Sequence, residues 1–129
     1  MKKIVIGLIA VILIAGLGWF YFGKNEQEIV KIGFNLPMTG QSAFKGEEFK
    51  RGLDLFLLPE NVQIIIEDNQ SNAAQAANIA KKFYSLDKVD VVISLFAPLS
   101  ASQRDISQTY KKPLISTLNP VSNFTENFP

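Results

Sequence analysis

The chain contains no cysteine and no histidine among its 129 residues. Without cysteine it can form no disulfide, no thiolate metal site, no cysteine nucleophile and no lipid attachment at a cysteine. Without histidine it lacks the commonest general base and the commonest metal ligand, so we expect no metal site, no cofactor and no enzymatic activity. An excess of one charge is also missing: 13 basic and 12 acidic residues leave a formal net charge of +1, which gives no reason to expect a nucleic-acid partner.

What the sequence does have is one long uncharged segment, at residues 4–22, which two lysines precede. As a helix this segment would be about 29 Å long, close to the thickness of a bilayer core. It ends in an aromatic cluster at 19–22, of the kind that lies at the level of lipid headgroups. We therefore assign residues 1–23 to a membrane anchor and 24–28 to a linker, with the rest of the chain outside the cytoplasm. A cleaved signal peptide, with a cleavage site near the small residues 16–18, is the alternative.

Residues 29–129 alternate between strand-like and helix-like stretches. Apolar, β-branched runs bounded by proline, glycine or asparagine indicate strands, and apolar residues three and four apart indicate helices. The pattern predicts strands at 29–36, 62–66, 89–95 and 114–116, and helices at 46–58, 73–86 and 101–110. The alternation predicts an α/β fold with a three-layer parallel sheet, right-handed crossovers and helices on both faces. The usual order of such a unit puts the first strand between the second and the third, so we expect the order 2-1-3-4.

The spacing of residues within two of these helices indicates which sides are buried. In the first helix, Phe49, Leu53 and Phe56 fall on one face. In the second, Asn72 and Gln75 have the spacing of a helix-capping pair. The buried face of the second helix is expected to consist of Ala76, Ile79, Ala80 and Phe83.

The expected order of the strands also predicts a ligand site. In open α/β sheets, ligands bind at the carboxyl ends of the strands where the chain reverses direction, here between the first and third strands. The loops that meet there are 38–44, 96–102 and 117–123. Ser100 lies at the predicted start of the third helix, where free backbone amides would favour a carboxylate. An anionic group of the ligand is therefore expected against Ser100.

Residues 36–40 spell LPMTG and match the LPxTG sorting signal. That signal needs an apolar stretch and a basic tail near a C-terminus, whereas here the motif follows the first predicted strand. We interpret it as a tight turn in which Gly40 supplies the backbone freedom.

Several segments, taken in order, carry a resemblance to a known family: 30–40, Gly46 with Glu47, Gly52, 67–72, 89–93 and 113–116. Together they resemble the first lobe of type 1 periplasmic binding proteins, and most of all the leucine/isoleucine/valine-binding group of ABC transporter substrate-binding proteins. The resemblance covers nearly all of residues 29–129. It implies a two-lobed fold that closes on a small ligand, commonly an amino acid, whose carboxylate meets hydroxyls and amides of the first lobe.

The resemblance also implies a ligand-binding set in the three loops: Phe44, Ala97, Ser100, Thr117, Leu118 and Asn119. The position of the usual serine after the third strand falls on Ala97 or Pro98, which leaves Ser100 as the nearest hydroxyl. Phe44 is the aromatic neighbour of Lys45, and Lys45 stands where an aromatic side chain often covers the ligand in this family.

We therefore expect the chain to be an N-terminal fragment, with an incomplete first lobe at residues 29–129, of an extracytoplasmic solute-binding protein of an ABC uptake system. Its partners would be a small-molecule ligand such as an amino acid, the membrane through residues 4–22, and an ABC transporter permease. It would face the periplasm or the cell exterior, anchored in the membrane or, if the signal is cleaved, secreted. The ligand-binding sensor domain of a membrane receptor is the alternative, and an exported enzyme is a third hypothesis that the missing histidine and cysteine weaken.

Overall fold

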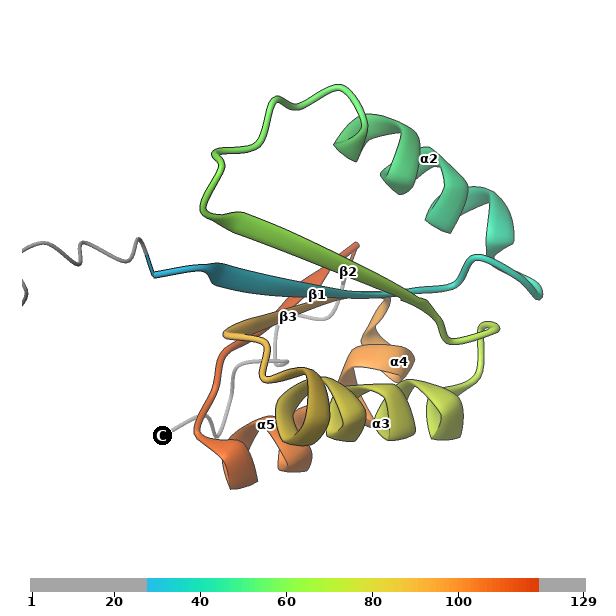
Figure 1. Cartoon of the computed structure of the whole chain (residues 1–129). Coiled ribbons are helices and arrows are strands. Elements are labelled where there is room, and N and C mark those ends of the chain that lie inside the picture. The colour runs from blue at the N-terminus through green and yellow to red at the C-terminus, as the bar shows by residue number, and fades with distance from the viewer. Residues whose placement is uncertain (1–27, 119–129) are drawn as a thin grey trace, which may run out of the picture.

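The computed structural model describes residues 28–118 (Figure 1). The assigned anchor, nearly all of the linker and Asn119 of the predicted site lie outside the described residues. The elements follow one another as β1 (Val30–Leu36), α2 (Ala43–Leu53), β2 (Val62–Asp68), α3 (Ala73–Lys82), the π-helix η1 (Phe83–Asp87), β3 (Val91–Leu95), α4 (Ala97–Ala101), α5 (Arg104–Tyr110) and β4 (Leu114–Thr117). Within this described part, none of the helices has both the length and the apolar character needed to cross a bilayer.

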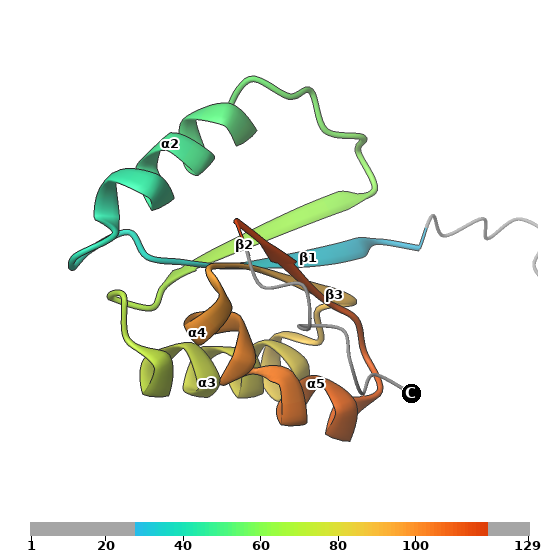
Figure 2. The ribbon, with the colours of Figure 1, turned by 180° about the vertical axis from the view of Figure 1, so that it is seen from behind.

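The four strands form one parallel sheet in the order β2-β1-β3-β4. α2 covers one face of the sheet, and α3, α4 and α5 cover the other (Figures 1 and 2). The three-layer α/β fold and the strand order that the sequence predicts are therefore confirmed. β1 lies between β2 and β3, so the order in which strands are added to the sheet reverses at β1. The carboxyl ends of these parallel strands meet at one edge of the sheet.

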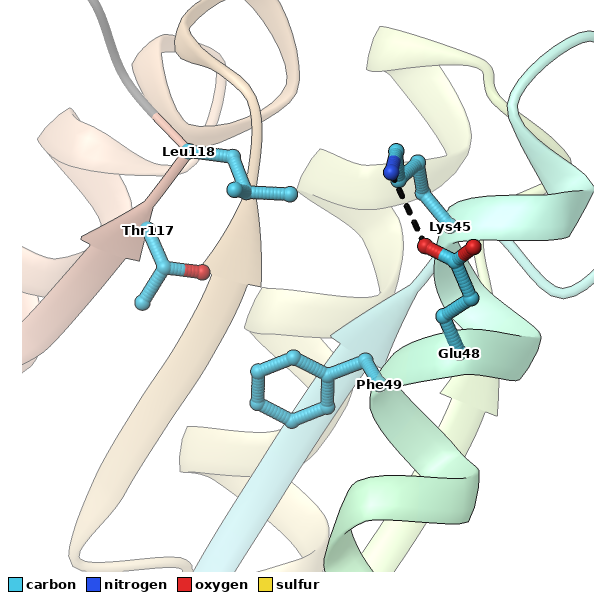
Figure 3. Close-up of a pocket in the computed structure, with 5 residues that line it drawn as sticks. All are labelled: Lys45, Glu48, Phe49, Thr117 and Leu118. Carbon is cyan, nitrogen blue, oxygen red and sulfur yellow. Dashed lines mark hydrogen bonds and ion pairs between the residues drawn. The ribbon is translucent and has the colours of Figure 1, made fainter.

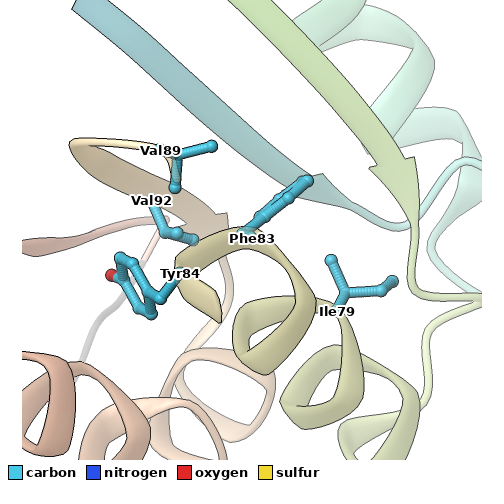
Figure 4. Close-up of a cluster of buried hydrophobic side chains, with 5 residues drawn as sticks. All are labelled: Ile79, Phe83, Tyr84, Val89 and Val92. Carbon is cyan, nitrogen blue, oxygen red and sulfur yellow. The ribbon is translucent and has the colours of Figure 1, made fainter. Parts of the chain in front are cut away.

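The main core lies between the sheet and α3 (Figure 4). Its buried cluster consists of Ile79, Phe83, Tyr84, Val89 and Val92. Gly33 of β1 lies against the ring of Phe83, and a Cβ added at this glycine would be only 2.7 Å from the nearest ring carbon. Since real side chains do not approach so closely, the sheet can rest on Phe83 only because residue 33 has no side chain.

The four side chains expected on the buried face are buried: Ala76, Ile79 and Ala80 of α3, and Phe83 at the start of η1. At its start the side-chain Oδ1 of Asn72 accepts a hydrogen bond from the backbone N–H of Gln75, at 3.0 Å, so the predicted cap is confirmed. The predicted single helix over 73–86 is divided between α3 and the π-helical turn η1.

Buried amide side chains join the sheet to the helices below it. Nδ2 of Asn35 donates to the backbone oxygen of Ala76 (2.8 Å) and to Oε1 of Gln103 (3.0 Å). Nε2 of Gln103 donates in turn to the hydroxyl of Ser94 (2.7 Å), and Nδ2 of Asn69 donates to Oδ1 of Asn35 (3.0 Å). Because a buried polar group left unpaired is costly, this network fixes the carboxyl halves of β1 and β3 relative to the helices.

The first helix ends earlier than predicted: α2 covers 43–53, whereas the spacing predicted 46–58. Phe49 and Leu53 pack, as expected, against a second buried cluster, on the α2 side of the sheet, which consists of Phe34, Leu36 and Leu95. Phe56 is 73% exposed, so its assignment to the buried face is wrong. Two residues explain the early end. Gly52 disfavours the last turn by about 1 kcal/mol relative to alanine, and Pro59 disfavours the helical conformation of the residue before it.

Candidate ligand-binding site

The loop after β1 is held by the carboxylate of Asp68, at the end of β2. Its Oδ1 accepts from the backbone N–H groups of Met38 (2.9 Å), Thr39 (3.1 Å) and Gln70 (2.8 Å), and its Oδ2 accepts from the hydroxyl of Thr39 (2.6 Å). Partial burial disfavours the charged carboxylate, but these hydrogen bonds outweigh that effect and lower the pKa of Asp68 below 3.8. The ionised carboxylate therefore fixes the first loop of the predicted site.

The LPMTG motif forms a turn that leads from this loop into α2. Gly40 has φ 83°, and a Cβ there would lie 2.6 Å from the backbone oxygen of Gln70. The hydroxyl of Ser71 donates to the backbone oxygen of Thr39 (3.0 Å) and accepts from the N–H of Ser42 (3.0 Å). The interpretation of the motif as a turn that needs Gly40 is therefore confirmed.

The loop after β3 differs from the expectation, because residues 97–101 form the helical turn α4. A proline near its start, Pro98, suits the first turn of a helix, so the helix begins at Ala97 and the predicted start at Ser100 is wrong. Ser100 is fully buried, and its N–H donates to the backbone oxygen of Phe96 (2.9 Å). Its hydroxyl accepts from the hydroxyl of Ser116 (2.7 Å). The free amides expected at Ser100 are therefore absent in this conformation.

Phe96, which precedes α4, has an unusual backbone conformation, with φ 64° and ψ 140°. This region of φ and ψ is strongly disfavoured for every residue except glycine, and such residues cluster at ligand-binding loops. The surrounding packing therefore imposes the shape of the loop at the end of β3.

At the end of β4, the hydroxyl oxygen of Thr117 is buried and has no hydrogen-bond partner. Among residues 28–118 it is the only buried side-chain oxygen or nitrogen that lacks a hydrogen-bond partner. Leu118 follows with φ 53° and an exposed side chain. A buried hydroxyl without a partner is unfavourable by about 1–3 kcal/mol unless a water or a ligand meets it.

A cavity of about 310 Å³ opens beside this hydroxyl, between the end of β4 and the first turns of α2 (Figure 3). Its lining consists of Lys45, Glu48, Phe49, Thr117 and Leu118. Figure 3 shows the Thr117 hydroxyl pointing into the space between β4 and α2, with the Phe49 ring on the side nearer the sheet. A volume of this size is at the lower end of the range for small-molecule sites.

The structure brings together only part of the set predicted from the sequence. Thr117 and Leu118 line the cavity, whereas Ala97 and Ser100 do not. Phe44 is exposed on the first turn of α2, and the Nζ of Lys45 lies 5.0 Å from the centre of its ring. Lys45, Glu48 and Phe49 are the lining residues that the sequence analysis did not assign to the site. Their i, i+3, i+4 spacing places them on one side of a helix, but only if the helix begins at residue 43 and not at 46.

The charges of the cavity form one ion pair. The Nζ of Lys45 lies 2.8 Å from Oε2 of Glu48, and both side chains remain partly exposed. The hydrogen bond from Lys45 lowers the pKa of Glu48. Among residues 28–118 no group of three or more acidic residues could hold a metal ion. The cavity thus offers one cation, one anion, a hydroxyl and two apolar side chains, which suits the binding of a small polar solute.

Comparison with known proteins identifies the class. The family model described as periplasmic binding protein matches residues 29–129, and the chain belongs to this family. The family consists of substrate-binding, non-enzymatic proteins, and its name indicates an extracytoplasmic location. No protein of curated function matches the sequence.

Solved structures share the fold. The substrate-binding protein LivJ of a Streptococcus pneumoniae branched-chain amino acid transporter, in complex with isoleucine, is 23% identical with a TM-score of 0.70 over 77% of this chain. An extracellular ligand-binding receptor of Rhodopseudomonas palustris is 27% identical with a TM-score of 0.71 over 80% of this chain. A solute-binding protein of an ABC transporter from R. palustris, in complex with 4-hydroxybenzoate, is 25% identical with a TM-score of 0.68 over 77% of this chain. These matches cover only 31%, 29% and 29% of the respective proteins, so the chain spans about a third of their length.

Proposed function

We propose that this chain is the partial first lobe, residues 29–129, of an extracytoplasmic solute-binding protein of an ABC uptake system. Residues 4–22 would hold it in the membrane, residues 24–28 would link anchor and lobe, and a transporter permease would be its partner. The observation that carries the proposal is the cavity beside Thr117, because it lies at the carboxyl edge of the sheet and contains a buried hydroxyl without a partner. The family match supports the same role.

The proposed ligands are small polar solutes, either amino acids or aromatic acids. Isoleucine is bound in the S. pneumoniae protein, and 4-hydroxybenzoate in one of the R. palustris proteins. The ligand would lie against Thr117 and Leu118, with Lys45 and Glu48 of α2 near its charged groups. Contacts from Phe44, Ala97, Ser100 and Asn119 stay predictions of the sequence.

The test is a titration of the isotopically labelled chain by nuclear magnetic resonance with amino acids and hydroxybenzoates. One lobe supplies one wall of the site, so we expect weak binding, with dissociation constants of about 1 mM or higher, and no saturable heat in calorimetry. The shifted amides should be those of the cavity lining. Saturable micromolar binding, or shifts confined to another part of the lobe, would contradict this proposal.

Thr117→Val separates the ligand role of the hydroxyl from a structural role. Removing a buried hydroxyl that has no partner should leave stability unchanged or raise it by about 1 kcal/mol. Binding of the same solute should weaken by roughly 2- to 10-fold, the worth of one hydrogen bond. Thr109→Val, on the exposed side of α5, is the matched control and should not affect binding. Unchanged affinity in Thr117→Val would remove the hydroxyl from the site.

A sensor domain of a membrane receptor is the second candidate, which the similarity to the R. palustris extracellular ligand-binding receptor favours. Both roles use the same ligand site and differ in the protein contacted at the membrane. Cross-linking in native membranes followed by mass spectrometry distinguishes them, since a transporter subunit is expected for uptake and a signalling protein for a sensor.

A further inference from the structure

The loop that follows α2 exposes four consecutive large apolar side chains. In this loop, Leu55 is 85% exposed, Phe56 73% and Leu57 100%, and Leu58 is also exposed. Single exposed leucines are common on protein surfaces, but a continuous apolar stretch usually marks a surface that contacts another apolar phase or a partner. Nothing in the described part of the chain covers this loop.

The loop runs from the end of α2 to the start of β2, and its last residues reach the edge of the sheet where the strands begin, which we call the amino edge (Figure 1). The backbone N–H of Val30 donates to the oxygen of Asn61 (2.8 Å), and Val30 is paired with Val62, so the end of the loop is fixed beside the start of β1. Ile29 and Val30 are themselves exposed, at 56% and 39%. The apolar loop and the point where the described chain begins are therefore neighbours.

The other strand beginnings add exposed apolar and basic side chains to the same edge. Leu86 and Tyr110 are exposed just before β3 and β4. Lys88 and Lys111, which end η1 and α5, are exposed as well. Leucine, aromatic residues and lysine are residue types typical of protein surfaces that lie in the interface between lipid and water. Exposed acidic side chains, Glu28, Glu60 and Asp90, lie just before β1, β2 and β3, so the apolar side chains and not the net charge favour contact with lipid here.

The length of the chain before this edge limits its distance from the membrane. The apolar segment proposed as the anchor ends at residue 22, and five residues, 23–27, separate it from Glu28. Even fully extended, these residues reach roughly 20 Å. So short a connection between the proposed anchor and β1 would keep the lobe close to the bilayer. The part of the lobe nearest the membrane would then be the amino edge, where the loop with the exposed leucines ends.

We propose that the amino edge of the lobe, together with the apolar loop 55–58 that leads to it, rests in the lipid headgroup layer. This inference depends on the proposed anchor at residues 4–22. The candidate ligand cavity lies at the opposite end of the strands, roughly 20 Å away for a strand of seven residues. The lobe would thus stand with its ligand-binding edge directed away from the membrane surface. Leu57 would insert most deeply, since its side chain is fully exposed.

The absence of cysteine makes the test direct, because one introduced cysteine is the only site that a thiol-reactive label can modify. The full chain, as Leu57→Cys and separately as Gln41→Cys, is labelled with an environment-sensitive fluorophore and reconstituted into phosphatidylcholine vesicles. Gln41 is the matched control, because it is exposed and lies at the carboxyl edge. Both variants are then compared in vesicles with and without nitroxide-labelled lipid, and flotation of the vesicles checks incorporation.

The label at position 57 should emit at shorter wavelength and lose about half of its fluorescence or more to nitroxides near the headgroups, as expected for burial of 5–10 Å into the interface. The label at position 41 should be unaffected. If the chain floats with the vesicles but the label at position 57 is not quenched, the lipid contact is wrong while the anchor stands. A blue-shifted label at position 57 without lipid quenching would indicate that protein covers the loop, which also overturns the proposal. If the chain does not float with the vesicles, both the anchor and the lipid contact are wrong.

Discussion

The two faces of the sheet are built differently. On the face of α3, aromatic and aliphatic side chains are fully buried, a glycine admits the Phe83 ring, and amides pair with one another. On the face of α2, one short helix covers the strands, Phe49 and Leu53 are only partly buried, and a cavity remains at the end of β4. The difference indicates that the α3 face provides most of the stability of the lobe, while the α2 face leaves room for a ligand.

Replacing matched phenylalanines on the two faces is the strongest test of this contrast. Phe83→Ala removes a fully buried ring beneath Gly33 and should lower the free energy of unfolding by about 3–5 kcal/mol. Phe56→Ala, at an exposed position after α2, should change it by less than about 0.5 kcal/mol. Urea denaturation followed by circular dichroism measures both. Equal losses from the two substitutions would mean that Phe56 is buried in solution.

A smaller effect is expected from the hydroxyl pair that joins α4 to β4. Ser100→Ala leaves the Ser116 hydroxyl without its partner at 2.7 Å and should cost about 1 kcal/mol of stability. Gln108→Ala, on the exposed side of α5, is the control and should be neutral. If Ser100→Ala instead weakens ligand binding without any loss of stability, the hydroxyl faces the ligand and not Ser116.

The smallest effect concerns the loop that Asp68 holds, and it depends on pH. Folding lowers the pKa of this carboxyl below 3.8, so its contribution to stability is complete above the unfolded value and is lost as the pH falls through the folded value. Near neutral pH, Asp68→Asn should therefore speed hydrogen exchange at the amides of Met38 and Thr39, which lose a charged acceptor. In the unchanged protein the same loss of protection, measured relative to the intrinsic exchange rate at each pH, should appear only below about pH 4. If these amides exchange equally fast in the unchanged protein and in the Asp68→Asn variant, the carboxylate does not hold the loop.

Much of the fold could be predicted from the sequence, because the helices and strands depend on the spacing of apolar residues and their connections depend on backbone chirality. The alternation of apolar runs and the right-handed crossover rule were enough to predict a parallel sheet, and the strand order was predicted from the usual order of such units. The cap at Asn72 and the buried side of α3 followed from spacing within one helix. These features depend on residues close in sequence, and the structure confirms them.

The site was less predictable, because small errors in helix position change which side chains meet. An error of three residues at the start of α2 concealed the shared side of Lys45, Glu48 and Phe49. The turn α4 was missed because a helix of five residues has too little periodicity to detect. Its presence turns Ser100 toward Ser116, a contact between residues of different elements that local spacing does not encode.

The contact between Gly33 and the ring of Phe83 has a consequence for how this sequence can vary. No side chain fits at residue 33 while a ring lies 2.7 Å from the position of its Cβ. Alanine or serine could enter there only together with a smaller residue at position 83, and a phenylalanine at 83 requires glycine at 33. Among related sequences the two positions should therefore change as a pair, although they lie on β1 and η1 and are separated by fifty residues of chain.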